Sequence, residues 1–199
     1  MARPRLHTTD AILDAARSLV LEEGARGATV DGIVARSGAP KGSIYHRFGT
    51  LDDLLAAMWL RAVRRVQERA LAALERDDAV EAAVGAALAL HDFARSDPAD
   101  ARLLASVRRE DLLRSVRDPE LRRSLSEVND PLARATRDIA RRLYGRATRP
   151  AIERALTAIV DLPQGAIRRH LVDGTPLPAG LRAQLEAAVR AALRSPAGP

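Results

Sequence analysis

Apolar residues recur at intervals of three and four along almost the whole chain, which is the period of an amphipathic helix and not of a strand. Alanine, leucine and arginine, which favour helices, dominate the sequence, whereas β-branched and aromatic residues are sparse. We therefore predict an all-α fold of about nine helices, without strands.

Cap signals define three short helices near the start of the chain. Thr8 and Thr9 are candidate caps of a first helix that stops at Gly24, and Thr29 is suited to cap a second. Gly38 then provides a residue that tolerates positive φ in a tight turn. The predicted helices span residues 9–23, 30–37 and 40–47.

Longer helices are expected after these three. Thr50 and Asp53 form a capping-box-like start for a fourth helix, and Asp97-Pro98 ends a fifth. A short helix is expected around Leu103, and a polar stretch with little periodicity follows it.

Three further helices complete the prediction. An apolar seam that alternates steps of four and three predicts one helix over 121–143, kinked at Pro131. A helix over 152–171 is expected to be kinked at Pro163, and a last helix covers 181–192.

The residues needed for most catalytic and metal chemistry are missing or scattered. The chain has no cysteine, and the closest two of its four histidines, His7 and His46, are 39 residues apart. No nucleophile-elbow motif, membrane-spanning apolar run or signal sequence is present. We therefore expect a cytoplasmic protein that is not an enzyme and has no catalytic residues, metal or cofactor.

The charge balance permits an anionic partner without requiring one. The 32 basic and 26 acidic residues give a net charge of +6, and Lys41 is the only lysine. Because the arginine bias is typical of a GC-rich genome, charge alone does not identify nucleic acid as the partner.

The first three predicted helices have the layout of a helix-turn-helix, with Ser37-Gly38-Ala39 between the second and the third. Ile44 and Phe48 are four residues apart, so both face the core from the third helix. The side chains expected on its outward face are Lys41, Ser43 and Tyr45.

The outward side chains have the chemistry of DNA contacts. Lys41 can donate to guanine O6 and N7 or to a phosphate, and Tyr45 can donate to a phosphate. Gly42 has no side chain, so the backbone can approach DNA closely there. For Arg3 and Arg5 two interpretations remain open, contact with the minor groove or phosphates and a disordered basic tail.

The segments ILDAARSLVLEEG and ATVDGIVARSGAPKGSIYHRFGTLDDLL strongly resemble the N-terminal DNA-binding domain of the tetracycline-repressor (TetR) family of bacterial transcriptional regulators. The chain length and the helical layout are similar to that family as well. The resemblance implies contacts with the major groove and with phosphates. The DNA-binding residues that it implies are Thr29, Pro40, Lys41, Gly42, Ser43, Tyr45 and Arg47.

Three positions depart from the family pattern. Leu51 stands where many members carry a lysine, so one phosphate contact is expected to be missing. Pro40 replaces a frequent serine, and Gly32 stands where an aspartate is common. None of these changes is expected to break the fold.

The resemblance implies a DNA-binding domain over 1–50 and a helical effector-binding and dimerisation domain over 51–199. Small and branched residues on the last two predicted helices allow close approach of a second copy. Packing of these faces within one subunit is the alternative. The candidate dimer-interface residues are Ala155, Ile159, Ala166, Ala188 and Ala191.

A candidate effector pocket lies among the longer helices. Apolar side chains with a few polar groups are typical of such a site. For the histidine and the tryptophan in it, ordinary core packing is the alternative interpretation. The candidate residues are Met58, Trp59, His91, Phe93, Leu103, Leu104 and Val107.

These patterns predict a homodimeric transcriptional regulator. We expect a repressor that binds a palindromic operator in double-stranded DNA and is released by a small-molecule effector. The alternative, suggested by Leu51, is a helical ligand-binding or scaffolding protein without specific DNA binding.

Overall fold

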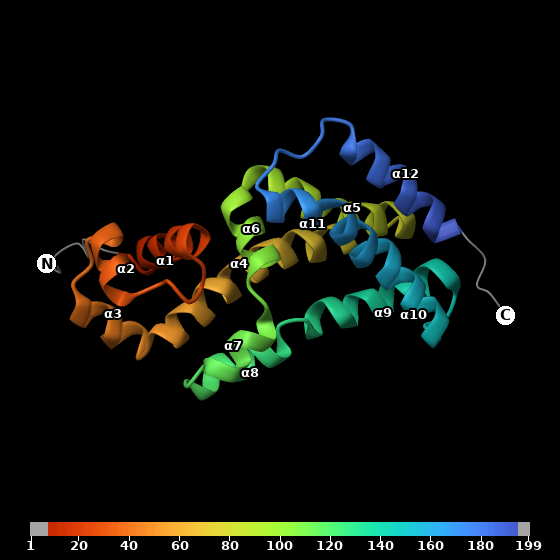
Figure 1. The fold of residues 1–199 in the computed structure, drawn as a ribbon. Coiled ribbons are helices and arrows are strands. Elements are labelled where there is room, and N and C mark those ends of the chain that lie inside the picture. Colours follow the sequence, from red (N-terminus) through yellow and green to blue (C-terminus); the bar gives the residue numbers. More distant parts are fainter. Residues whose placement is uncertain (1–7, 195–199) are drawn as a thin grey trace, which may run out of the picture. The chain divides into compact units, whose positions relative to one another are not determined.

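The computed structural model describes residues 8–194 (Figure 1). These residues form twelve α-helices and one π-helical turn and contain no strand, so the all-α prediction is confirmed and the expected number of about nine helices is too low. The helices are α1 (Thr9–Glu23), α2 (Val30–Ser37), α3 (Lys41–Phe48), α4 (Leu51–Leu74), α5 (Ala79–Ser96), α6 (Pro98–Ser106), α7 (Arg109–Ser115), α8 (Pro119–Glu127), α9 (Asp130–Tyr144), α10 (Arg149–Leu156), the π turn η1 (Thr157–Asp161), α11 (Leu162–Asp173) and α12 (Leu181–Arg194).

The chain divides into two compact units. Unit 1 contains the described residues up to Val63 together with Arg102–Val128, and unit 2 contains Arg64–Ala101 and the described residues from Asn129 onward. The helices α4 and α6 therefore each contribute residues to both units. Within residues 8–194, no helix has the length and apolar character needed to cross a membrane.

The core of unit 1 is one apolar cluster. It contains side chains of α1, α2, α3 and the N-terminal half of α4, together with side chains of α6, α7 and α8. Full burial of such side chains contributes about 1.5–3 kcal/mol each, so this cluster fixes the three short helices that precede α4. Its fully buried large side chains include Ile12, Leu19, Ile33, Ile44, Leu54, Leu60, Leu103 and Leu125.

The predicted caps of the first two helices are confirmed. The Thr8 hydroxyl accepts a hydrogen bond from the Ala11 backbone N–H, and the Thr29 hydroxyl accepts one from Gly32, both at 3.1 Å. Gly38 ends α2 with a φ of +68°, a left-handed conformation that favours glycine. The turn that leads into α3 is thus fixed by residues close to it in sequence.

The predicted start of α4 is also confirmed, and its carboxylate has a second role. The Thr50 hydroxyl accepts from the Asp53 backbone N–H at 3.1 Å and donates to the Asp53 carboxylate at 2.6 Å. That carboxylate, only 3% exposed, also accepts from the backbone N–H groups of Arg117 and Asp118, at 2.8 and 2.9 Å. Burial alone would raise the pKa of Asp53, but these hydrogen bonds outweigh it and hold the pKa below its usual value.

Unit 2 combines a core of small side chains with ion pairs between helices. Most buried residues of α5 are alanines. The guanidinium of Arg182 on α12 lies 3.1 Å from the Asp92 carboxylate on α5, and that of Arg190 lies 2.6 Å from Glu81. These two pairs connect α12 to α5 at points eight residues apart along α12.

The predictions of a single helix over 121–143 and of a kink at Pro131 are wrong. The single helix expected over 121–143 is two helices, α8 and α9, separated at Val128 and Asn129. Pro131 lies in the first turn of α9, where a missing N–H costs no intrahelical bond, so it does not kink a continuous helix. The polar stretch with little periodicity, for which no helix was predicted, contains α7.

The irregularity that Pro163 predicts takes the form of a π-helical turn. The predicted helix over 152–171 comprises α10, η1 and α11, and the Leu162 N–H donates to the Thr157 carbonyl, five residues earlier. Proline lacks an N–H and its ring crowds the carbonyl four residues before it, here that of Ile159. A wider turn just before the proline accommodates this conflict.

Candidate nucleic-acid interface

The inward face of α3 is anchored in the core of unit 1. Ile44 is 2% exposed, and Ile33 of α2 and Ala39 of the intervening turn are fully buried. Phe48 packs against the same cluster from the last turn of α3. These anchors set the rotation of α3 about its axis, and therefore which side chains it presents to solvent.

The opposite face of α3 is open, as predicted. Lys41 and Tyr45 are exposed, Tyr45 by 45%, which is high for an aromatic residue, and Pro40 before them is exposed too. Ser43 and Arg47 are half-buried at the edge of this face. The predicted outward orientation of Lys41 and Tyr45 is confirmed, and contact of these residues with DNA stays a prediction.

Gly42 lies in the middle of the exposed face, and the fold does not require it. A Cβ added there would meet no atom within 4 Å. Its φ is not in the left-handed region, so an alanine would fit a helix at this point without strain. A glycine with no structural necessity on an exposed helix face is consistent with close approach by another molecule.

Gly32, in contrast, lies where a side chain would crowd its neighbours. A Cβ at this position would lie 2.9 Å from Cδ2 of Leu19, which is buried, and 3.2 Å from the Thr29 hydroxyl oxygen. Glycine in place of the common aspartate therefore allows α1 and α2 to pack closely at this point. Thr29 itself is exposed, and while its oxygen accepts from Gly32 its hydroxyl hydrogen remains able to donate.

A carboxylate that sequence reasoning missed lies on the same surface. Asp31, in the first turn of α2, places its Oδ1 2.8 Å from Nζ of Lys41, and both side chains are exposed, by 78% and 53% respectively. The hydrogen bond and the charge of Asp31 raise the pKa of Lys41. The two residues are ten positions apart on different helices, so no local spacing rule indicates the pair.

His46 is a second residue on this face that the prediction omitted. It is exposed and follows Gly42 by one helical turn, so a helical-wheel projection would have placed it there. Leu51, where a lysine is common in the family, is half-buried and packs against the core of unit 1. Arg3 and Arg5 lie outside the described residues.

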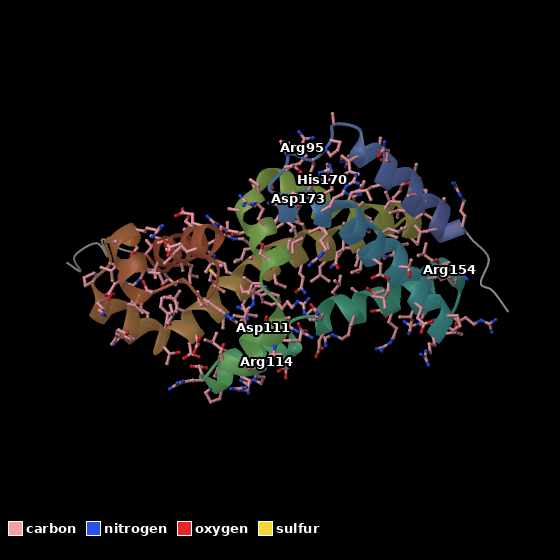
Figure 2. The ribbon with its side chains drawn as sticks, viewed as in Figure 1. Arg95, Asp111, Arg114, Arg154, His170 and Asp173 are labelled. Atoms are coloured by element: carbon pink, nitrogen blue, oxygen red, sulfur yellow. The ribbon has the colours of Figure 1, made fainter. Side chains whose placement is uncertain are left out.

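Charge does not single out this surface, because arginines elsewhere are extensively engaged. Arg114 pairs with Asp111 along α7, and the guanidinium of Arg154 on α10 lies 5.0 Å from the ring centroid of Tyr144 (Figure 2). The candidate interface therefore rests on the geometry of α3 and not on the net charge of the chain.

The predicted effector residues are divided between the two units. Met58, Trp59 and Leu103 are buried in the core of unit 1, where the Trp59 indole N–H donates to the Val107 carbonyl at 3.1 Å; Leu104 packs at the edge of the same cluster. Whether these residues bind a ligand stays a prediction.

The other two predicted effector residues, His91 and Phe93, are buried in unit 2. Nδ1 of His91, which is 1% exposed, lies 3.0 Å from the Asp92 carboxylate that also binds Arg182. The guanidinium of Arg69 lies 5.1 Å from the Phe93 ring centroid. Both buried side chains of α5 thus have specific neighbours within unit 2.

The predicted dimer residues have mixed burial within the single chain. Ala155 and Ile159 are buried, Ala166 is half-buried, and Ala188 and Ala191 are exposed on α12. The inward positions of α12 are occupied by larger residues, namely Leu181, Leu185, Val189 and Leu193. Of the five predicted residues, Ala188 and Ala191 are thus the two that lie on the exposed face of α12.

A known protein family matches the part of the chain that carries the surface just described. Residues 12–58 match the model of "Bacterial regulatory proteins, tetR family", a range that contains α2, the turn and all of α3. The resemblance predicted from the sequence is therefore confirmed for this segment. No curated protein sequence gives a significant match to the chain.

Solved structures extend the likeness to the rest of the fold. The TetR family regulator PfmR from Thermus thermophilus is 20% identical, with a TM-score of 0.71 over 92% of this chain and 97% of its own. A tetR family protein from Rhodococcus RHA1 is 20% identical, with a TM-score of 0.72 over 96% and 97%.

FadR from Bacillus subtilis, solved in complex with stearoyl-CoA, is 19% identical, with a TM-score of 0.69 over 94% of this chain and 98% of its own. At identities this low the three structures establish a shared fold. They do not assign a ligand to this chain.

Proposed function

We propose that the chain is a DNA-binding transcriptional regulator whose α3 enters the major groove, because residues 12–58 match the model of the tetR family of bacterial regulatory proteins. Proteins of this family are transcription factors, and we assign the chain no catalytic role. Repression, a palindromic operator and release by a small molecule are the finer parts of the proposal.

One observation carries the DNA-binding proposal. Burial of Ile44 turns Lys41 and Tyr45 outward on the second helix of a helix-turn-helix, with the unobstructed Gly42 between them. Lysine can donate to guanine O6 and N7, and a tyrosine hydroxyl can donate to a phosphate. An exposed face of this composition is what a reading helix needs.

The test uses two duplexes. The first, called the selected duplex, is recovered by in vitro selection from a random library with the wild-type protein, and the second is a scrambled duplex of equal composition. Fluorescence anisotropy near physiological salt measures both affinities. Preference for the selected duplex supports specific DNA binding, whereas equal weak binding to both supports the helical scaffolding alternative.

Two substitutions assign the roles on α3. We expect Lys41→Ala to weaken binding to the selected duplex by roughly 5- to 150-fold and to relax preference at one base pair per half-site. We expect Tyr45→Phe to lower affinity with the base preference retained. Arg137→Ala on α9, which also removes an exposed cation, is the matched control and should change neither.

The proposed dimer predicts the spacing of the operator. Two reading helices enter successive major grooves on one face of DNA, so half-site centres should lie about 34–36 Å apart or at a multiple of that distance. Support for a dimer comes from the exposed small residues of α12. A selected sequence without an inverted repeat would contradict this part of the proposal.

Ala188→Glu tests the assembly directly. The alanine is exposed in the single chain, so a glutamate there leaves the subunit folded but places a charge in the proposed interface. We expect monomers by analytical ultracentrifugation, whereas Ala133→Glu, at an exposed alanine of α9, should leave the dimer intact. Ile159 is unsuitable for this test because it is buried within its own subunit.

Release by an effector requires a ligand that binds the DNA-free conformation more tightly, and a typical coupling lowers operator affinity by roughly 5- to 150-fold. Stearoyl-CoA, which binds the FadR of similar fold, is the first probe. Trp59 is the only tryptophan and is buried, so its fluorescence reports a change around it. A probe that shifts this emission without lowering affinity for the selected duplex is not the effector.

A further inference from the structure

The ion pair between Lys41 and Asp31 lies on the surface proposed to bind DNA. Asp31 Oδ1 approaches Lys41 Nζ to 2.8 Å, from the first turn of α2 to the first residue of α3. DNA offers closely spaced phosphates, and an exposed carboxylate on a DNA-binding surface is repelled by them. A surface that bound DNA through positive charge alone would not contain this carboxylate, so its presence next to Lys41 requires an explanation.

The geometry leaves Lys41 with donors to spare. An ammonium group has three N–H donors, and Asp31 takes one of them. Two donors remain, which is the number needed to contact O6 and N7 of one guanine. Holding the flexible lysine stem in one orientation also reduces the conformational entropy lost when the base is bound.

The same pair disfavours contacts that involve phosphate alone. While it is paired with Asp31, Lys41 can donate a hydrogen bond to a phosphate, but the pair has no net charge with which to neutralise it, and the Asp31 carboxylate repels the DNA backbone. Complexes with unrelated sequences depend almost entirely on phosphate contacts, so they bear this penalty in full. A complex with the right guanine keeps the Lys41 to Asp31 bond while the base is read.

We propose that Asp31 is a specificity-determining residue, which positions Lys41 for base reading and penalises sequence-independent binding to DNA. The inference rests on the proposed DNA-binding function. Asp31 acts through Lys41 and through its charge, and it makes no base contact in this proposal.

The test compares wild-type protein with Asp31→Asn on the selected and scrambled duplexes, between about 50 and 200 mM salt. The substitution keeps the side-chain shape and leaves the Thr29 cap of α2 in place. We expect affinity for the scrambled duplex to rise by about 2- to 5-fold and the salt-dependence slope to steepen by about 0.9, the value for one added phosphate contact. Affinity for the selected duplex should rise less or fall, so that the specificity ratio decreases.

Two controls separate this effect from a change in net charge. Asp138→Asn on α9 breaks a similarly exposed pair with Arg141, at 2.9 Å, and should leave the specificity ratio unchanged. In a Lys41→Gln background, Asp31→Asn should no longer steepen the salt slope. Circular dichroism confirms that each variant is folded.

The outcomes are distinguishable. If Asp31→Asn raises affinity for both duplexes equally, or has the same effect as Asp138→Asn, the proposed role of Asp31 is overturned while DNA binding stands. If the wild-type protein shows no preference for the selected duplex, the proposed function itself fails.

Discussion

The two compact units hold their helices together in different ways. Unit 1 is built on a continuous cluster of large apolar side chains with one deeply buried carboxylate, Asp53, inside it. Unit 2 buries many alanines and connects α12 to α5 through exposed ion pairs such as Arg190 to Glu81. The position of α3 therefore depends on large buried side chains, whereas part of the contact between α5 and α12 depends on exposed ion pairs.

This difference suits what each unit is proposed to do. A reading helix needs a fixed rotation, which the apolar anchors of α3 provide at several kcal/mol. Exposed ion pairs contribute about 0–1 kcal/mol each and are screened by salt, so the pairs between α5 and α12 can break at small cost while the apolar face of α12 stays buried. Four predictions, ordered by the size of the expected effect, test the contrast.

Removing the buried carboxylate should have the largest effect. We expect Asp53→Ala to destabilise unit 1 by about 2–4 kcal/mol, because the N–H groups of Arg117 and Asp118 and the Thr50 hydroxyl all lose their acceptor. Urea denaturation followed by Trp59 fluorescence measures it, since that tryptophan lies in unit 1. A loss no greater than that of an exposed pair would break the contrast.

The same group predicts a response to acid. The folded pKa of Asp53 is lowered relative to an unfolded value of about 3.9, so its stabilisation is fully present above that value and is lost as pH falls through the folded pKa. The free energy of unfolding of wild-type protein should therefore decline below about pH 4. In Asp53→Asn the decline should be shallower, and an identical pH profile would contradict the assignment to this carboxylate.

Gly42→Ala should separate stability from DNA binding. The added methyl meets no atom, and alanine favours a helix over glycine by up to about 1 kcal/mol, so unit 1 should become slightly more stable. Affinity for the selected duplex should fall if DNA approaches the backbone there. A stabilised variant that binds DNA as tightly as wild type would show that the glycine has no role in binding.

The smallest effect is expected in unit 2. Asp92→Asn weakens one contact between α5 and α12, and because the Asp92 side chain is about half exposed the cost should be at most about 1 kcal/mol and should shrink with added salt. Circular dichroism of the helical transition measures it. A cost as large as that of Asp53→Ala would mean that unit 2 also depends on single strong interactions.

The sequence predicts best what is determined by neighbours along the chain. Thr8, Thr29 and Gly38 each act within four residues, and the three short helices begin and end close to where these residues predict. Ile44 and Phe48 share a helix face by simple periodicity, which was enough to orient α3.

The sequence predicts least well what depends on residues far apart. The apolar seam over 121–143 continues across the break between α8 and α9, because each helix buries its own stripe in a different unit. Periodicity alone therefore could not locate the break. Asp31 and Lys41 meet only because a turn folds α2 against α3, and Asp53 reaches backbone groups more than sixty residues away.

The division of unit 1 along the chain has a consequence for engineering. Its first part ends at Val63, but Leu103, Leu112 and Leu125 of the same core are supplied by the segment Arg102–Val128. A hybrid regulator made by joining only the N-terminal part to a foreign sensor would expose the faces that these leucines cover. A functional graft must carry both segments, or must redesign the uncovered side of α4 for water.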